Sequence, residues 1–412
     1  MQFSSLKLSS SIQKALSKNN FIDATPIQEQ VIPHVLEGVD VMARAKTGSG
    51  KSASYVLPIL ELLLQRRGEG KAKIKVLVLT PTRELTLQIA KTFETFAEFI
   101  QNTPKVVSLI GGEGIGDQLF DIQQGCEILV ATSGRFLDVL SKKQMNLSHL
   151  EFLVLDEADK MLNLGFAGEL DLILEAIPAK RQNLLFSATY PEKILNIASK
   201  ITKDPVEVSI EEDVPTVETI TQRVIEVDVN NRGALLKHLM KTLKLKNVLV
   251  FMANKRATDN IAFKFRKQGF AAESFHGDLT QEDRTFTLNE FKDAKIKILF
   301  ATDIAARGLD IDNIECVINF DLPRSPTDYI HRIGRTARAG KSGLAISFIS
   351  HEDQAHFEVI EKKCKVKIDR EQIEGFELTG EAPKKEKGPA PVKGKGKSKK
   401  DKLREKALQS EK

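Results

Sequence analysis

Short apolar runs alternate with amphipathic stretches along most of the chain. In the first half, apolar and β-branched runs that suit buried strands cover residues 39–43, 74–79, 106–110, 128–131, 152–155 and 184–186. Helical patterns separate these runs, as in residues 4–18 and 84–100. Strands that alternate with helices predict a parallel, doubly wound sheet, in which functional groups collect at the carboxyl ends of the strands.

The same alternation returns in the second half of the chain. Its predicted strands cover residues 224–227, 247–252, 271–275, 296–301, 316–320 and 344–349, with helices over 256–268 and 281–292 among them. Between the two halves, residues 204–219 carry two prolines and an acidic cluster and lack a helical period. We therefore predict an α/β domain over residues 1–208, a linker over 209–219, a second α/β domain over 220–370 and a tail over 371–412.

The composition is that of a soluble globular protein with more than one domain. The chain has 412 residues, of which 41% are hydrophobic and 28% are charged. No window approaches 18 uncharged apolar residues, and the N-terminus lacks the pattern of a secretory signal. Three widely separated cysteines fit a reducing compartment and form no C-x-x-C metal motif. These features predict a cytoplasmic protein without a membrane partner.

The positive charge of the chain is concentrated at its C-terminal end. The formal net charge is +5, yet residues 383–412 alone contain 12 Lys and Arg against 4 Asp and Glu. This segment is also rich in Gly and Pro and nearly free of apolar residues, which predicts disorder. A basic tail adds salt-sensitive attraction to nucleic-acid phosphates, but a purely solubilising tail has the same composition.

A glycine-rich segment, residues 45–52 (AKTGSGKS), lies between a predicted strand and a predicted helix. Such a turn can place backbone N–H groups around phosphate oxygens, and the helix N-terminus adds partial positive charge. Lys51 is suited to reach the outer phosphates, and the Ser52 hydroxyl to bind Mg²⁺. Ala45 stands where this pattern usually has its first glycine, so a flexible turn with an unrelated lysine is the alternative.

Two carboxylates, Asp156 and Glu157, follow the predicted strand over 152–155. Asp156 is suited to hold Mg²⁺ through water, and Glu157 to orient and deprotonate an attacking water. An aspartate at the end of a strand is more often a helix cap. Because a phosphate-binding loop occurs about a hundred residues upstream, we favour the catalytic interpretation.

Two further segments have less specific patterns. Phe21 and Gln28 flank a Thr-Pro pair, and an aromatic ring with a nearby amide suits an adenine base, although a capped helix preceded by a core phenylalanine is the better explanation of these residues alone. Arg332, Arg335 and Arg338 are spaced to share one helix face, where an anion such as a γ-phosphate would offset their mutual repulsion. A solvated basic face or an acidic neighbour is the alternative for these arginines.

Taken together, these motifs resemble the DEAD-box family of ATP-dependent RNA helicases. Residues 156–159 spell the four letters of the family name, and the ordered motifs extend over about residues 1–370. The short core is similar to bacterial members. The resemblance implies two RecA-like, doubly wound parallel-sheet domains in tandem, followed by a disordered basic C-terminal tail.

The resemblance also implies a role for each matching residue. It implies catalytic roles for Glu157, Asp156, Lys51, Arg335 and Arg338. It implies ATP binding by Phe21, Gln28, Ala45, Thr47, Gly48, Ser49, Gly50, Lys51, Ser52, Arg307 and Asp310, with Mg²⁺ held by Ser52 and Asp156 largely through water. It implies RNA contacts by Thr82, Arg83, Gly112, Thr132, Arg135, His276, Gly277, Arg284 and Thr302. It implies that Ser187, Thr189 and Asp159 couple hydrolysis to strand separation.

The expected activity is RNA-dependent ATP hydrolysis with local unwinding of short RNA duplexes or remodelling of ribonucleoproteins. RNA would be bound mainly through its sugar-phosphate backbone, and the two domains of a monomer suffice for the cleft. Ribosome-assembly or RNA-decay proteins are the expected partners. Two alternatives use the same paired core: a DNA translocase, and an RNA scaffold in which hydrolysis matters little. Ala24 and Ser133 stand where the family often has proline, and neither change removes a required group.

Overall fold

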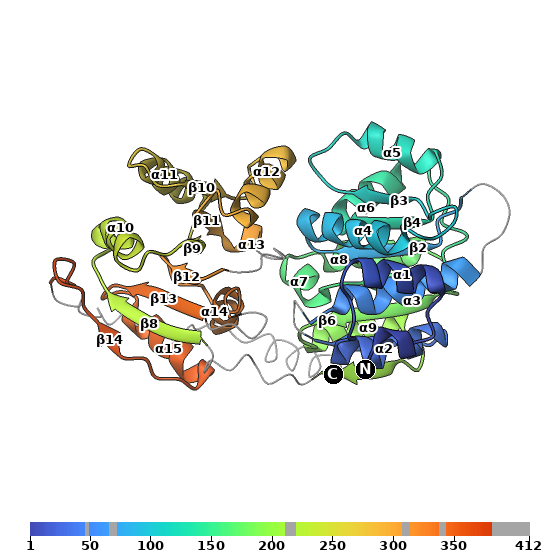
Figure 1. Ribbon diagram of the computed structural model, residues 1–412, viewed down its shortest axis with the longest axis horizontal. Coiled ribbons are helices and arrows are strands. Elements are labelled where there is room, and N and C mark those ends of the chain that lie inside the picture. The colour runs from blue at the N-terminus through green and yellow to red at the C-terminus, as the bar shows by residue number, and fades with distance from the viewer. Residues whose placement is uncertain (46–48, 66–71, 211–219, 307–313, 338–342, 381–412) are drawn as a thin grey trace, which may run out of the picture.

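We analysed a computed structural model of the protein, which describes residues 1–45, 49–65, 72–210, 220–306, 314–337 and 343–380. Figure 1 shows two α/β domains side by side, each built on its own sheet. Among the described residues, no helix combines the length and the apolar character that a membrane span requires.

The first domain has a sheet of seven strands in the order β3-β4-β2-β5-β6-β1-β7, and every pairing is parallel. The strands are β1 (Val41–Arg44), β2 (Val76–Thr80), β3 (Val106–Leu109), β4 (Ile128–Thr132), β5 (Phe152–Leu155), β6 (Gln182–Ser187) and β7 (Val206–Ser209). The helices are α1 (Ser10–Lys18), α2 (Pro26–Leu36), α3 (Lys51–Gln65), α4 (Arg83–Ala97), α5 (Ile115–Gln123), α6 (Ser133–Ser141), α7 (Ala158–Asn163), α8 (Ala167–Ala176) and α9 (Glu192–Ile201).

The second domain repeats this plan with the strand order β10-β11-β9-β12-β13-β8-β14, again fully parallel. Its strands are β8 (Ile220–Glu226), β9 (Val248–Met252), β10 (Ala272–Phe275), β11 (Ile298–Thr302), β12 (Cys316–Asn319), β13 (Gly343–Ile349) and β14 (Arg370–Glu371). Its helices are α10 (Arg232–Thr242), α11 (Lys255–Arg266), α12 (Gln281–Lys292), α13 (Asp303–Ala306), α14 (Pro326–Ile333) and α15 (Gln354–Cys364).

Strand β2 shows why the central strands read as continuous apolar runs. Successive side chains of a strand point to opposite faces of the sheet. Val76 and Val78 therefore enter the core cluster on one face, whereas Leu77 and Leu79 enter the cluster on the other. Helices cover both faces of the sheet, so each position along the strand is buried and apolar, as expected for a parallel sheet.

The strand order sorts the predicted motifs into two groups on the first domain. The glycine-rich segment follows β1, Asp156 follows β5 and Ser187 ends β6, and these three strands are neighbours. Thr82, Gly112 and Thr132 follow or end β2, β3 and β4, which form the other half of the sheet. The carboxyl edge of one sheet thus carries two adjacent but separate sites.

One predicted boundary differs from the structure. The tail was predicted to begin at residue 371, but Arg370–Glu371 form strand β14, and Ile373 and Phe376 pack against the core of the second domain. Thr379 donates a hydrogen bond from its hydroxyl to the Asp228 carboxylate at 2.7 Å. The short strand was missed because it has only two residues and no apolar pattern of its own. Residues 211–219 of the predicted linker and residues 381–412 of the predicted tail lie outside the described residues.

Candidate functional site

The described end of the glycine-rich segment is held by the start of α2. The Gln28 side chain accepts a hydrogen bond from the Thr25 backbone N–H at 2.9 Å and donates one to the Gly50 carbonyl oxygen at 3.0 Å. Gly50 has φ +92°, and a Cβ there would lie 2.5 Å from Gln28 Nε2, so this position requires glycine. Through these two hydrogen bonds Gln28, which is 2% exposed, links the residue before α2 to the residue before α3.

Lys51 begins α3, and its side chain turns back into the loop. The Lys51 ammonium donates a hydrogen bond to the Ala45 carbonyl oxygen at 2.9 Å and is buried. Its charge acts on both Asp156 and Glu157. Ser52 follows at the helix N-terminus, where backbone N–H groups are unpaired and an anion is favoured. Thr47 and Gly48, also predicted here, lie outside the described residues.

The Asp156 carboxylate is restrained by a neighbour that sequence reasoning missed. Tyr55, fully buried in α3, donates a hydrogen bond from its hydroxyl to Asp156 Oδ2 at 2.9 Å. Burial, followed by the Asp156 charge, raises the pKa of Tyr55 well above its usual value, so the hydroxyl keeps its proton and donates. Asp156 Oδ1 is also buried, and the described residues give it no hydrogen-bond partner.

Glu157 occupies a strained position next to Asp156. Its backbone is left-handed, with φ 53° and ψ 46°, a conformation that non-glycine residues rarely adopt and that concentrates at functional sites. Its side chain is 3% exposed and accepts a hydrogen bond from Lys160 Nζ at 2.5 Å. The turn into α7 thus aims the Glu157 carboxylate at a buried cation on the same helix.

The two adjacent carboxylates have opposite pKa shifts. Burial raises the pKa of Asp156, with Lys51 acting against this shift and Glu157 adding to it. Burial also acts to raise the pKa of Glu157, but the charges of Lys160, Lys51 and Arg335 outweigh it, and the pKa lies below its usual value. Environments that separate the pKa values of two neighbouring acids are typical of sites with two distinct carboxylate roles.

Arg335 brings the second domain to this cluster. It is 7% exposed, and its charge acts on Glu157 and Lys160 of the first domain. Arg332 and Arg335 do not share a helix as predicted, because α14 ends at Ile333 and Gly334 follows as its cap. Arg335 therefore lies in the turn after the helix, while Arg338, Arg307 and Asp310 lie outside the described residues.

Arg332, the first of the three arginines, is occupied within its own domain. Its guanidinium donates to both carboxylate oxygens of Asp303 at 2.6 Å and to the Asp321 carbonyl oxygen at 2.6 Å. It also lies over the Phe251 ring, 4.8 Å from the ring centroid. Arg332 thus joins the ends of β9, β11 and β12, which keeps the turn that carries Arg335 in place.

The predicted coupling residues form one hydrogen-bonded group. Thr189 donates from its hydroxyl to Asp159 Oδ2 at 3.0 Å, and Ser187 accepts from the Asp159 backbone N–H at 3.3 Å. The Ser187 hydroxyl also donates to the Thr189 carbonyl oxygen at 2.7 Å. The end of β6 is therefore tied to α7, the helix that Glu157 begins.

The other half of the sheet edge gathers the predicted RNA contacts of the first domain. Thr82 caps α4 by accepting from the Leu85 N–H at 3.3 Å. The Arg83 guanidinium lies against Gly112, whose φ is +89° and where a Cβ would lie 2.6 Å from it. The Arg135 guanidinium donates to the Glu113 carbonyl oxygen at 3.0 Å, and Thr132 ends β4 beside it. The fold therefore brings these five positions to one edge.

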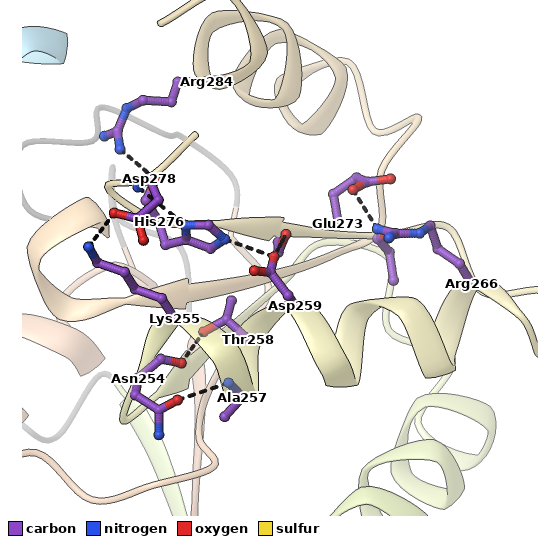
Figure 2. Close-up of polar contacts among 12 residues, drawn as sticks. Asn254, Lys255, Ala257, Thr258, Asp259, Arg266, Glu273, His276, Asp278 and Arg284 are labelled. Atoms are coloured by element: carbon purple, nitrogen blue, oxygen red, sulfur yellow. Dashed lines mark hydrogen bonds and ion pairs between the residues drawn. The ribbon is translucent and has the colours of Figure 1, made fainter. Parts of the chain in front are cut away.

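The second domain places two predicted RNA contacts differently. The Arg284 guanidinium donates from Nε to Glu84 Oε1 at 2.5 Å, across the two domains, and is 5% exposed. His276 is 4% exposed, and its ring lies against Asp259 (Figure 2). Of the two predicted RNA contacts in this turn, only Gly277 is exposed. Thr302, another predicted contact, is half-buried at the end of β11.

Phe21 is also placed differently from the prediction. Its ring packs edge-on against Phe96, with 5.3 Å between the ring centroids, and against Phe3 at 6.4 Å. It lines a groove of about 450 Å³ between α4 and α12 and is 41% exposed. The interactions described for Phe21 join it to this groove and not to the glycine-rich segment, because the turn after α1 directs the ring toward α4.

The residues that sequence reasoning missed act through the predicted ones. Tyr55 and Lys160 hold the two carboxylates, and Glu84 binds Arg284. Tyr55 lies one helical turn after Lys51. Its hydroxyl on an otherwise apolar helix face was the feature of the sequence that could have identified it as part of the site. Glu84 follows Arg83 at the start of α4, where an acidic residue is already explained by the helix dipole.

The residues present fit a magnesium ion that is bound mainly through water. Mg²⁺ is commonly held by one or two carboxylates together with substrate phosphates and waters. Asp156 offers a buried carboxylate with one unpaired oxygen, and Ser52 offers a hydroxyl at the start of α3. Within the described ranges no group of three His, Cys, Asp or Glu side chains forms a closed metal cage.

Two family models match the chain. Residues 25–197 match the model described as DEAD/DEAH box helicase, and residues 231–340 match the helicase conserved C-terminal domain. The matched segments coincide with the two α/β domains and include the glycine-rich segment, Asp156, Glu157 and Arg335.

Known proteins with similar sequences and structures carry related descriptions. The DEAD-box ATP-dependent RNA helicase CshA of Bacillus subtilis is 39% identical over 368 residues, which are 89% of this chain and 73% of that protein. Mss116p bound to single-stranded RNA and AMP-PNP matches with a TM-score of 0.81 and 30% identity, over 91% of this chain and 80% of Mss116p. Dbp5 of S. cerevisiae, bound to RNA and ADP-BeF3, matches with a TM-score of 0.77 and 27% identity, over 90% of this chain and 95% of Dbp5.

Proposed function

The chain belongs to the DEAD-box family of ATP-dependent RNA helicases, and on that premise we propose how its residues couple ATP hydrolysis to RNA. ATP binds in the cleft between the two domains, and RNA binds across the adjacent half of both sheet edges. The observation that carries this proposal is the buried cluster in which Lys51 and Glu157 of one domain meet the charge of Arg335 from the other.

Each residue of this cluster has one task in the reaction. Lys51 binds the outer phosphates once it leaves the Ala45 carbonyl oxygen, and Ser52 with Asp156 holds Mg²⁺. The ion, when bound, neutralises charge that develops on the phosphate oxygens. Glu157 orients the attacking water and accepts its proton, and its lowered pKa keeps the carboxylate in the ionised form that this role requires. Arg335 stabilises the charge of the transferring phosphoryl group.

RNA promotes the reaction by favouring the closed arrangement of the domains. The Glu84–Arg284 ion pair joins the two domains beside the proposed RNA contacts. Both side chains are nearly buried, at 11% and 6% exposed. Thr82, Arg83, Gly112, Thr132 and Arg135 on one domain, with Gly277 and Thr302 on the other, bind the sugar-phosphate backbone. Binding is therefore largely independent of sequence and decreases with salt. Closure bends the strand and opens a short duplex.

The proposed chemistry also suits a particular cellular location, oligomeric state and class of partner. A cytoplasmic location suits ATP and RNA as substrates and suits Cys126, Cys316 and Cys364, which are free thiols. A monomer is sufficient because one chain supplies both walls of the cleft. Proteins of ribosome assembly or RNA decay are the partners that this activity suits.

Replacing Arg335 by alanine tests the cleft mechanism directly. We expect Arg335→Ala to lose most RNA-stimulated ATP turnover and duplex unwinding, by about a thousandfold, because the transition-state charge loses its partner. Affinity for ATP should stay within a few-fold of the wild type, measured with a fluorescent nucleotide. Arg324→Ala, an exposed arginine of the same domain, is the control and should behave as wild type. Unchanged turnover of Arg335→Ala at saturating RNA would refute the assigned role.

A further inference from the structure

We infer that Asp259 and His276 are positioning residues that aim Arg284 at Glu84 and thereby support closure of the two domains. The inference rests on the proposed function, in which the Glu84–Arg284 ion pair stabilises the closed arrangement. Neither residue lies at the nucleotide cluster. Asp259 belongs to α11, and His276 follows β10, so both belong to the second domain.

The His276 ring is fixed from both of its nitrogens (Figure 2). His276 Nε2 lies 2.8 Å from Asp259 Oδ1, and Nδ1 lies 3.3 Å from the Asp278 backbone nitrogen. Because the backbone N–H can only donate, Nδ1 accepts, and Nε2 is the nitrogen that donates to Asp259. The carboxylate of Asp259 thus selects the tautomer that closes the turn over residues 276–278.

The closed turn presents a backbone carbonyl to Arg284. The His276 carbonyl oxygen accepts a hydrogen bond from Arg284 Nη1 at 3.0 Å. The guanidinium also lies over the Phe275 ring, 4.5 Å from its centroid. With one edge held by the carbonyl and one face by the ring, the Nε edge is left to meet Glu84 at 2.5 Å.

Asp259 is itself held in the orientation that this role requires. Its Oδ1 also accepts a hydrogen bond from the Ser274 hydroxyl at 2.6 Å. About half of the Asp259 side chain remains exposed, so burial does not explain the residue as part of the core. A carboxylate that receives two side-chain donors, one of them the ring that shapes an interdomain contact, is more than a solvated surface charge.

The same two elements offer a matched control. Arg266 of α11 and Glu273 of β10 form an ion pair at 2.6 Å, with both side chains 39% exposed. This pair joins α11 to β10 just as Asp259 joins α11 to the end of β10, but it has no contact with Arg284 (Figure 2). Removing this pair shows how far the loss of one link between α11 and β10 affects domain closure by itself.

The experiment measures closure by energy transfer between dyes on exposed positions of α5 and α15, at increasing single-stranded RNA with AMP-PNP. We expect Asp259→Ala to raise the RNA concentration for half-maximal closure by about two- to thirtyfold. His276→Asn, which keeps an acceptor near Nδ1 but cannot reach Asp259, should give a similar increase. Glu273→Gln should match the wild type, and RNA-free nucleotide binding should be unchanged in all variants.

A double-mutant cycle separates positioning from a general weakening of the domain. If Asp259 acts through Arg284, adding Asp259→Ala to Glu84→Gln should have little further effect on closure. The inference would be overturned if the two changes multiplied in their effect on the RNA concentration for half-maximal closure. It would also be overturned if Asp259→Ala closed like the wild type while Glu84→Gln was impaired. Either result would leave the proposed function intact. If the wild-type protein does not close with RNA and AMP-PNP, the proposed function fails and the inference fails with it. Should Asp259→Ala not fold, Asp259→Asn serves in its place.

Discussion

At the scale of single residues, the chemistry of the cleft depends on how neighbours restrain two adjacent carboxylates. Tyr55 binds one oxygen of Asp156, and Lys160 binds one oxygen of Glu157. Each carboxylate is thereby held in one orientation before any ligand arrives. Such preorganisation saves the cost of ordering the group during binding or reaction.

Replacing Tyr55 by phenylalanine removes the restraint on Asp156 together with the interaction of the hydroxyl with Ser52. The ring keeps its packing against Phe186, 5.0 Å between centroids, and only the hydroxyl is lost. We expect Tyr55→Phe to raise the Mg²⁺ concentration for half-maximal nucleotide binding by about tenfold, because the carboxylate is less well oriented. A fluorescent ATP analogue titrated with Mg²⁺ measures this effect, and binding without Mg²⁺ is the control. Equal Mg²⁺ dependence in both proteins would argue against the role of Tyr55.

Sequence patterns identified the residues with distinctive spacing and missed those that act through them. The glycine-rich segment and the Asp156-Glu157 pair were predicted because phosphate binding needs those residue types in that order. Tyr55 and Lys160 occupy positions where an aromatic or a lysine on a helix is unremarkable. The contact of Phe21 with the base stays a prediction. Its ring faces the groove beside α4, a direction that depends on packing that the sequence does not show.

At the scale of elements, the main errors concern where helices and domains end. Because Arg332, Arg335 and Arg338 are three residues apart, we predicted that they lie on one helix. In the structure α14 ends at Ile333, and Gly334 is its cap. The turn that follows directs Arg335 to the cleft, which a continuing helix would not do in the same way. Strand β14 was missed because its two residues are charged, and pairing with β8 stabilises them more than any local preference.

The attachment of β14 gives a prediction about the stability of the second domain. Arg370 donates to both oxygens of Glu361 at 2.8 Å, and this hydrogen bonding is the main reason that the pKa of Glu361 lies below its usual value. We expect Glu361→Gln to lower the free energy of unfolding by about 1–3 kcal/mol, measured by thermal or denaturant unfolding at neutral pH.

The pH dependence has a definite sign. A carboxylate whose pKa is lowered by folding stabilises the protein above its unfolded pKa, and this contribution is lost as the pH falls through the folded pKa. The difference in stability between wild type and Glu361→Gln should therefore shrink as the solution becomes more acidic. Glu352→Gln, an exposed residue near the start of α15, is the control. A difference that grows toward low pH would contradict this assignment.

At the scale of the whole molecule, the order of strands explains why the two proposed ligand sites share one edge. The motifs assigned to ATP follow β1, β5 and β6, and those assigned to RNA follow β2, β3 and β4. Periodicity predicted two parallel α/β domains, and both sheets are parallel throughout. The order of the strands could not be predicted from periodicity, because it depends on contacts between segments far apart in the chain.

The basic segment after Gly380 should affect RNA binding without being needed for turnover. Residues 381–412 carry 12 Lys and Arg and 5 Asp and Glu. Removing them should weaken RNA binding and reduce the slope of log affinity against log salt, since fewer phosphate counterions are released. Turnover at saturating RNA should remain near wild type. A full-length protein with these lysines replaced by glutamine is the control, and an unchanged salt slope in both variants would exclude the tail from RNA binding.

The central claim is that RNA closes two domains into one ATP-hydrolysing cleft. The most direct test is the rate of ATP hydrolysis by the full-length protein alone, with single-stranded RNA, and with DNA of the same sequence and length. We expect a low basal rate that RNA raises many-fold and DNA raises little. A rate that is unaffected by RNA, or raised equally by DNA, would contradict RNA-driven closure.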